Sequence, residues 1–204
     1  MSLAGVIDHV EPRIRKHWLE RRRGAAALLI LAPFLYAALL TPAANEPTWA
    51  ASLWKSLGWL LFLAGAIFRL MSTLYIGGRK GEQLVTEGPY SITRNPLYFG
   101  TLLIALSSAC FLESGWLALG VVPATIAYLG CTLASERRRL TAKHGLVYLQ
   151  YCERVPALMP NLKSWQSSEV IEVDSRCLKI ELLRSLRWFS LPLAALLLNY
   201  LRSA

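Results

Sequence analysis

The chain has 204 residues, of which 54% are hydrophobic and only 17% are charged, and this composition excludes an ordinary soluble domain. The formal net charge is +9, but no aromatic-interleaved binding motif accompanies the basic residues, so nucleic acid is not an expected partner. Anionic lipid head groups are the partner that this charge favours.

The apolar residues gather into long blocks, and a helix needs roughly 20 residues to cross a bilayer core of about 30 Å. Only Glu113-Ser114-Gly115 separates the third block from the fourth, which predicts a tight helical hairpin. A fifth block, 188–201, is short, so we expect an interfacial or partly inserted helix and leave a full span open. The sequence predicts an all-α integral membrane protein with four to five transmembrane helices, the first four over 24–40, 50–71, 96–112 and 116–135.

Basic residues mark the cytoplasmic side of a membrane protein. Of the 22 Lys and Arg residues, six precede the first block, three lie in 72–95 and ten lie in 136–187, whereas 41–49 and 113–115 contain none. This asymmetry predicts a cytoplasmic N-terminus and cytoplasmic 72–95 and 136–187 regions, in a membrane that we expect to be a bacterial inner membrane.

Three parts of the chain follow from these blocks. They are a basic N-terminal segment (1–23), a membrane core (24–163) and a C-terminal linker with its helix (164–204). Lys55 and Arg69 fall near the ends of the second block, where long side chains can reach the interface.

Two predicted cytoplasmic segments carry an unusual density of polar and aromatic residues. In the first, Gly88-Pro89 predicts a turn and Pro96 suits the first turn of a helix, so a short irregular stretch lies at the membrane surface. Lipid cannot satisfy the amides of such a stretch, which must be buried in protein or line a wet cavity. A cofactor cavity fits that requirement.

The second segment follows the fourth block. Glu136 and Leu140 share one helix face there, as do Tyr148 and Tyr151. A basic amphipathic helix lying on anionic lipid, with its aromatic residues at the interface, also explains this pattern. That alternative stays open.

Taken in order, the two segments resemble the family of isoprenylcysteine carboxyl methyltransferases and their bacterial and phospholipid methyltransferase relatives. The resemblance covers about residues 50–163. The residues that carry it are Gly88-Pro89-Tyr90, Arg94-Asn95-Pro96-Leu97-Tyr98, Glu136, Leu140, His144-Gly145, Tyr148, Tyr151 and Val155-Pro156 with Pro160.

The resemblance implies a membrane methyltransferase that uses S-adenosylmethionine. The cofactor would lie in a cytoplasmic pocket formed by the 72–98 loop and the 135–163 segment, and a lipid-like or small amphiphilic acceptor would be methylated at oxygen or nitrogen. No general base is assigned and no metal is expected. The implied cofactor contacts are Glu82, Gln83, Leu84, Val85, Tyr90, Asn95, Pro96, Leu97, Tyr98 and Glu136.

The chain departs from the family pattern at three positions. Asn95 stands where histidine is common, and Arg137 stands where a second acidic residue often follows Glu136. Thr132 occupies the position at which the prenylcysteine enzymes hold a substrate carboxylate with arginine. A buried carboxylate without a cation is costly, so prenylcysteine is a disfavoured acceptor, and Thr132 and Arg94 are only weak candidates for acceptor binding.

Two other functions remain as alternatives. A membrane reductase of a steroid or enoyl lipid would need cations for the phosphates of NADPH, which Arg79, Lys80 and the arginines at 137–139 can supply. A transporter or scaffold is less favoured, because no internal repeat is visible. The sequence leaves the oligomeric state open.

Overall fold

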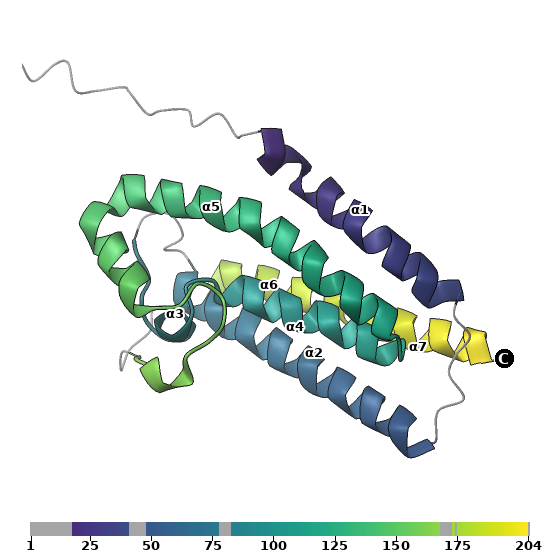
Figure 1. Cartoon of the computed structure of the whole chain (residues 1–204). Helices are drawn as coiled ribbons and strands as arrows, with labels where there is room; N and C mark the ends of the chain where they lie inside the picture. The colour runs from purple at the N-terminus through teal and green to yellow at the C-terminus, as the bar shows by residue number, and fades with distance from the viewer. Residues whose placement is uncertain (1–17, 41–47, 78–82, 168–172, 174, 204) are drawn as a thin grey trace, which may run out of the picture.

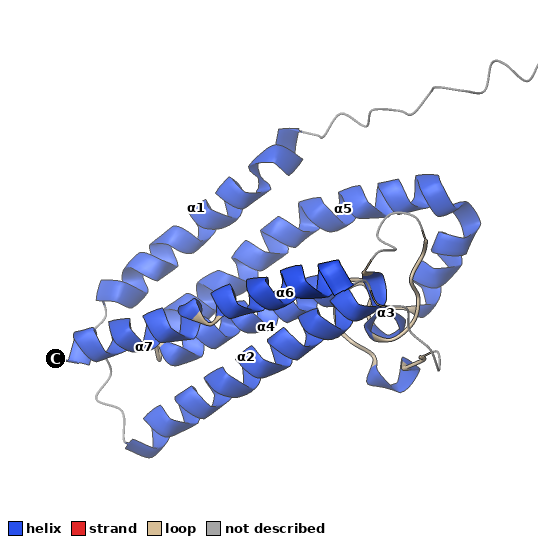
Figure 2. Cartoon of the chain, turned by 180° about the vertical axis from the view of Figure 1, so that it is seen from behind, coloured by secondary structure: helices blue, strands red, loops and turns tan. Residues whose placement is uncertain are grey.

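The computed structural model describes residues 18–40, 48–77, 83–167, 173 and 175–203, and no strand occurs within these ranges (Figure 2). The all-helical class predicted from the sequence is therefore confirmed. The helices are α1 (Trp18–Leu40), α2 (Thr48–Ile76), α3 (Pro89–Ile92), α4 (Pro96–Phe111), α5 (Gly115–Arg154), the short 3-10 helix η2 (Leu162–Ser164), α6 (Ser175–Trp188) and α7 (Ser190–Ser203).

The long helices form one bundle (Figure 1). Helix α2 packs along α4, α1 packs along α5, and contacts between α4 and α5 join the two pairs. Helix α6 lies against α2, and α7 continues from it against α4. The start of α2, the α4–α5 turn and the end of α7 lie at one end of the bundle, while α3, the bend of α5 and the start of α6 lie at the other (Figure 1).

Helix α2 has the side-chain pattern of a helix surrounded by lipid. Its outward face carries large apolar residues at a helical spacing, namely Leu53, Leu57, Leu60, Leu63 and Ile67. Its inward face carries mostly small or polar residues, namely Gly58, Phe62, Gly65, Arg69 and Ser72. A soluble helix has the opposite distribution, whereas small residues at helix contacts are typical of membrane proteins.

Two of the described helices are long and apolar enough to cross a membrane: α2 over Trp49–Ile76 and α5 over Gly115–Arg154. The other apolar stretches are shorter, at Gly24–Leu40, Pro96–Phe111 and Ser190–Tyr200. The helices thus indicate a membrane protein with two candidate spans in the described part of the chain. Four to five spans stays a prediction, which requires the shorter helices to cross beside α2 and α5.

The predicted hairpin between the third and fourth blocks is confirmed. Glu113 adopts a positive φ of 50°, and the hydroxyl of Ser114 accepts a hydrogen bond of 3.3 Å from the amide of Leu117 at the start of α5. Helix α5 does not end at residue 135 as the fourth block does, but continues to Arg154. Residues 136–144 are polar but are mostly good helix formers without proline, so the end of the apolar block is not the end of the helix.

A close crossing fixes α2 against α4. A Cβ atom added to Gly65 would lie 2.6 Å from the carbonyl oxygen of Gly100, and one added to Gly100 would lie 2.7 Å from that of Gly65. Only glycine allows the two backbones to approach this closely. Arg69 and Thr101 follow these glycines along their helices, and the crossing brings them into contact.

Candidate functional site

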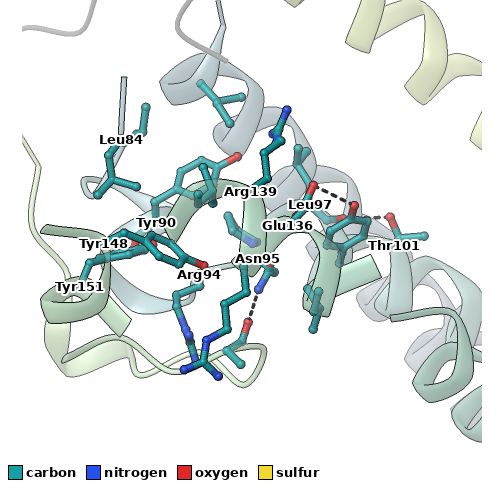
Figure 3. Close-up of a pocket in the computed structure, with 18 of the residues that line it drawn as sticks. Leu84, Tyr90, Arg94, Asn95, Leu97, Thr101, Glu136, Arg139, Tyr148 and Tyr151 are labelled. Carbon is teal, nitrogen blue, oxygen red and sulfur yellow. Dashed lines mark hydrogen bonds between the residues drawn. The ribbon is translucent and has the colours of Figure 1, made fainter. Parts of the chain in front are cut away.

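A cavity of about 640 Å³ lies at the end of the bundle that holds α3 and the bend of α5. Residues of α2, the 83–98 segment, α5 and α6 line it. Its volume falls within the roughly 300–1,000 Å³ that is typical of small-molecule sites. Figure 3 shows Leu84, Tyr148 and Tyr151 at one end of the cavity and Thr101 at the other, with Glu136 and Leu97 between them.

The floor of this cavity is built where two distant segments run side by side. The amide of Arg94 donates to the carbonyl of Pro156 at 2.9 Å, and the amide of Asn161 donates to the carbonyl of Ile92 at 2.9 Å. The side chain of Asn95 adds a bond of 2.7 Å from Nδ2 to the carbonyl of Ala157. The two motifs that the sequence analysis singled out are therefore joined through their backbones.

Gly145 turns the end of α5 back over the cavity. Its φ of 55° and ψ of −129° interrupt the helix, in a region that side-chain-bearing residues rarely adopt. The following turns bring Tyr148 and Tyr151 into the protein, where both are buried with ring centroids 6.1 Å apart. The sequence left open that these tyrosines lie exposed at the lipid interface. The structure shows both of them buried in the protein.

Tyr90 is held between the two motifs. The hydroxyl of Tyr151 donates a hydrogen bond of 2.7 Å to the main-chain carbonyl of Tyr90. Burial raises the pKa of the Tyr90 phenol well above its usual value, and the negative forms of Tyr151 and Glu136 add to the rise. The phenol therefore stays protonated and can donate a hydrogen bond.

Glu136 and Arg94 supply opposite charges to the cavity. Tyr98 donates a hydrogen bond of 3.3 Å to Glu136 Oε1, which is the only carboxylate among the described lining residues. Arg94 also lines the cavity, and its Nε is buried without a hydrogen-bond partner among the residues that the structure describes. A buried donor left unsatisfied is costly, so the Arg94 site favours an anionic or carbonyl group from a ligand.

The other end of the cavity is built around a buried ion pair. Nε and Nη2 of Arg69 lie 2.9 and 2.8 Å from Glu181 Oε1, and Nη1 donates to Thr101 Oγ1 at 2.6 Å. The Trp188 ring lies under the guanidinium, 5.7 Å from ring centroid to Cζ. Arg69 is 8% exposed and Glu181 is 2% exposed. Arg69 therefore does not reach the membrane interface as expected, because a partner on α6 satisfies it inside the bundle.

A second, apolar cavity of about 210 Å³ adjoins the first. It lies between α1, α4 and α5, and Leu28 and Leu31 form part of its α1 wall. Tyr98, Thr101 and Tyr128 line both cavities, so these three residues form the junction between them.

The described residues predicted for the cofactor site all line this cavity, and of the two weak candidates for acceptor binding, Arg94 lines it and Thr132 does not. Thr132 is 2% exposed, and its hydroxyl donates to the carbonyl of Tyr128 at 2.8 Å. Glu82 lies outside the described residues. The predicted residues that line the cavity are Gln83, Leu84, Val85, Tyr90, Arg94, Asn95, Pro96, Leu97, Tyr98 and Glu136.

Sequence reasoning missed the α6 wall and the role of Arg69. Glu181 and Trp188 fall in the C-terminal part of the chain, to which no site was assigned. One signal was available, because an arginine within an apolar helix is a functional-site hypothesis by default. Its partner was not predictable, because Glu181 lies 112 residues away along the chain.

The fold and the cavity define a helical membrane protein with a cavity of small-molecule size at one end of its bundle. The model of the phospholipid methyltransferase family matches residues 53–145, a range that contains α3, α4 and most of α2 and α5. No solved structure shows a significant match.

Two curated bacterial proteins are similar over a longer range. The cobalt-zinc-cadmium resistance protein CzcN of Cupriavidus metallidurans is 33% identical over 150 residues, which cover 72% of this chain and 68% of that protein. The nickel-cobalt-cadmium resistance protein NccN of Alcaligenes xylosoxydans xylosoxydans is 27% identical over 150 residues, with 74% and 70% covered. The chain belongs to the phospholipid methyltransferase family, the group to which the isoprenylcysteine carboxyl methyltransferases are related.

Proposed function

We propose that this chain is an integral membrane enzyme that transfers a methyl group from S-adenosylmethionine to an oxygen or nitrogen of a lipid-like or small amphiphilic acceptor. The observation that carries the proposal is the cavity in which the two motifs meet, with the Glu136 carboxylate and the unpartnered Nε of Arg94 on its wall. Membership of a methyltransferase family supports the same reaction class.

The chemistry of the lining residues fits S-adenosylmethionine. Arg94 suits the carboxylate of its amino-acid part, and Glu136 suits either the ribose hydroxyls or the ammonium group. The faces of Tyr90 and Tyr98 suit an adenine ring or a sulfonium cation. When bound, the cofactor supplies a methyl group on a sulfonium, which is already a good leaving group.

The protein then has to align the acceptor and exclude water. Holding two reactants in near-attack geometry supplies roughly 7–11 kcal/mol. A strong base is therefore optional for an acceptor that carries no proton on the attacking atom, whereas an amine or hydroxyl acceptor also has to release one proton as the methyl group is transferred. We assign no general base to this chain.

The apolar cavity supports an acceptor with a hydrocarbon part. A tail held by the α1, α4 and α5 walls would bring its head group to Tyr98, Thr101 and Tyr128, at the junction with the larger cavity. In this arrangement α1, α4 and α7 cross the membrane beside α2 and α5, and the cofactor end of the bundle faces the cytoplasm. The predominance of basic residues at 72–95 and 136–187 supports that orientation.

A thermal shift in detergent tests the cofactor class. S-adenosylhomocysteine should stabilise the purified chain, and NADPH at the same concentration should not, because S-adenosylhomocysteine carries the adenosine and amino-acid parts that match the site described above. Glu136→Gln is the matched variant, since it keeps the side-chain shape and removes the charge. Stabilisation by NADPH alone would support the reductase instead.

Product identification tests the acceptor class. Purified protein is incubated with methyl-labelled S-adenosylmethionine and a total lipid extract, and the labelled species is isolated. A labelled amphiphile that disappears with Glu136→Gln supports the proposal, and absence of any labelled product contradicts it.

The names of the two relatives suggest a physiological setting for the reaction. Both are named as resistance proteins for divalent metals, and we propose that this chain acts in the same setting. A deletion strain should become more sensitive to cobalt or cadmium, and the wild-type gene should restore growth where the Glu136→Gln gene does not. If both genes restored growth equally, metal resistance would not depend on the enzyme activity.

A further inference from the structure

The buried pair of Arg69 and Glu181 stands beside the point where the two cavities meet. Arg69 donates through Nη1 to Thr101 Oγ1 at 2.6 Å, and Thr101 lines both cavities. On the same junction, Tyr98 donates to Glu136 at 3.3 Å. An amphiphile whose tail fills the apolar cavity would therefore bring its head group to Thr101 and Tyr98, which are hydrogen-bonded to Arg69 and Glu136.

The charge of Arg69 at this junction is balanced by a partner. Arg69 brings one positive charge and Glu181 brings one negative charge, and Glu136 adds a second negative charge through its hydrogen bond with Tyr98. Other arginines, namely Arg94, Arg137 and Arg139, line the larger cavity but not the apolar one. The Glu181 carboxylate oxygen accepts from both Nε and Nη2 of Arg69, at 2.9 and 2.8 Å. Both partners are almost fully buried, so solvent does little to screen the pair from a head group nearby.

The partner of Arg69 comes from outside the part of the chain that the family model matches. Glu181 lies on α6 (Ser175–Trp188), and the family match ends at residue 145. The same helix contributes Trp188 to the cavity wall. The C-terminal segment thus completes the acceptor end of the cavity and sets its charge.

We propose that Glu181 determines acceptor specificity: by neutralising Arg69 beside Thr101, it makes the head-group site unfavourable for carboxylates and suited to uncharged or amine head groups. This inference rests on the proposed function only in calling the bound amphiphile a methyl acceptor. The preference for one head-group charge over another is a property of binding. It holds for amphiphile binding whether or not a methyl group is transferred.

A series of ten-carbon probes tests the inference. Decylamine, decanol and decanoate share one tail and differ in head-group charge at pH 7. Their binding to the full chain in phosphatidylcholine nanodiscs is measured by calorimetry with empty nanodiscs subtracted, after saturation with S-adenosylhomocysteine so that the Arg94 end is filled. Wild type should bind decanol and decylamine at least about tenfold more tightly than decanoate, a difference of about 1.4 kcal/mol.

Two variants test whether the head-group preference depends on the pair of Arg69 and Glu181. Glu181→Gln leaves Arg69 without that carboxylate and should raise the affinity for decanoate relative to decanol by at least about tenfold. Arg69→Gln/Glu181→Gln removes both charges, and the decanoate-to-decanol ratio should return toward the wild-type value. Glu181→Met, which also removes the charge, replaces Glu181→Gln if the amide variant does not insert.

Three results would overturn the inference: equal binding of decanoate and decanol by wild type, an unchanged ratio in a folded Glu181→Gln or Glu181→Met protein, or a gain that persists without Arg69. Failure of the proposed function is distinct from these. A chain that shows the charge preference in every arm but gives no response to S-adenosylhomocysteine would contradict the methyltransferase proposal and leave the role of Glu181 intact.

Discussion

The hydroxyl of Tyr151 donates a hydrogen bond of 2.7 Å to the main-chain carbonyl of Tyr90. This bond joins the bent end of α5 to α3, and both residues line the larger cavity. A side chain that bridges two segments in this way helps to fix the shape of the cavity wall.

Removing that hydroxyl should loosen the wall and weaken cofactor binding. Tyr151→Phe leaves a buried carbonyl without its donor, which typically costs about 1–3 kcal/mol. We expect a lower unfolding temperature and a weaker affinity for S-adenosylhomocysteine by calorimetry. Gln150→Ala, at an exposed position on the same helical turn, should change neither quantity. Equal values for Tyr151→Phe and wild type would show that the bond has no role in the cavity.

The glycine crossing should be intolerant of any larger residue. Gly100→Val places side-chain atoms where the Gly65 carbonyl and the Arg69 side chain lie, and overpacking of this kind typically costs about 1–3 kcal/mol. Thermal unfolding in detergent measures the loss. Gly130→Ala is the matched control, since a Cβ at Gly130 meets nothing within 4 Å. A Gly100→Val protein as stable as Gly130→Ala would mean that α2 and α4 do not cross here.

The sequence predicted the helical blocks because apolar length is a local signal, and it predicted the meeting of the two motifs only through their resemblance to a methyltransferase family. Apolar length indicated α2 and α5, and Glu113-Ser114-Gly115 indicated the hairpin. Arg69 was misread because its distance from the end of α2 resembles that of a snorkelling residue. Its partner Glu181 lies 112 residues further along the chain, on α6. Only the tertiary fold brings the two residues together, so the pairing could not be inferred from the sequence. The place of Thr132 was likewise not predictable from the sequence. Its hydroxyl donates to the carbonyl of Tyr128 within α5 and does not face the cavity.

The orientation in the membrane predicts a clear labelling pattern. Gly115, at the α4–α5 turn, is exposed, and a Cβ there meets nothing within 4 Å. Lys163 is exposed in η2, which contacts α3 at the opposite end of the bundle. A membrane-impermeant thiol reagent added to intact cells should label Gly115→Cys and should label Lys163→Cys only after permeabilisation, because basic segments stay cytoplasmic. The reverse pattern would refute a cytoplasmic cofactor site.

The hydrogen bond between Tyr98 and Glu136 predicts that substitutions of these two residues weaken cofactor binding to different extents. Glu136→Gln removes the carboxylate and should weaken S-adenosylhomocysteine binding by about 1.5–3 kcal/mol, the usual value for a hydrogen bond to a charged group. Tyr98→Phe removes only the phenol that donates to Glu136 at 3.3 Å, so its effect should be smaller. Calorimetry on both variants gives the order. A larger loss for Tyr98→Phe would mean that the phenol, and not the carboxylate, contacts the ligand.

Variants of Arg94 and Glu136 should show which side chain contacts the amino-acid part of the cofactor. The Nε of Arg94 is buried without a partner, and the best match for it is the carboxylate of that part. Methylthioadenosine keeps the adenosine and the sulfur but lacks the carboxylate and the ammonium group. Arg94→Gln should therefore weaken S-adenosylhomocysteine binding by about 1.5–3 kcal/mol, which is roughly 10- to 150-fold.

The same substitution should leave the affinity for methylthioadenosine nearly unchanged, because the lost cation has no counterpart on that ligand. Glu136→Gln separates two roles by the same comparison: a loss for both ligands assigns its carboxylate to the ribose, and a loss for S-adenosylhomocysteine alone assigns it to the ammonium group. Arg138→Gln, at an exposed position on α5 that does not line the cavity, controls for the general loss of positive charge. If Arg94→Gln weakened both ligands equally, or neither, Arg94 would not hold the carboxylate, since only a contact with the amino-acid part distinguishes the two molecules.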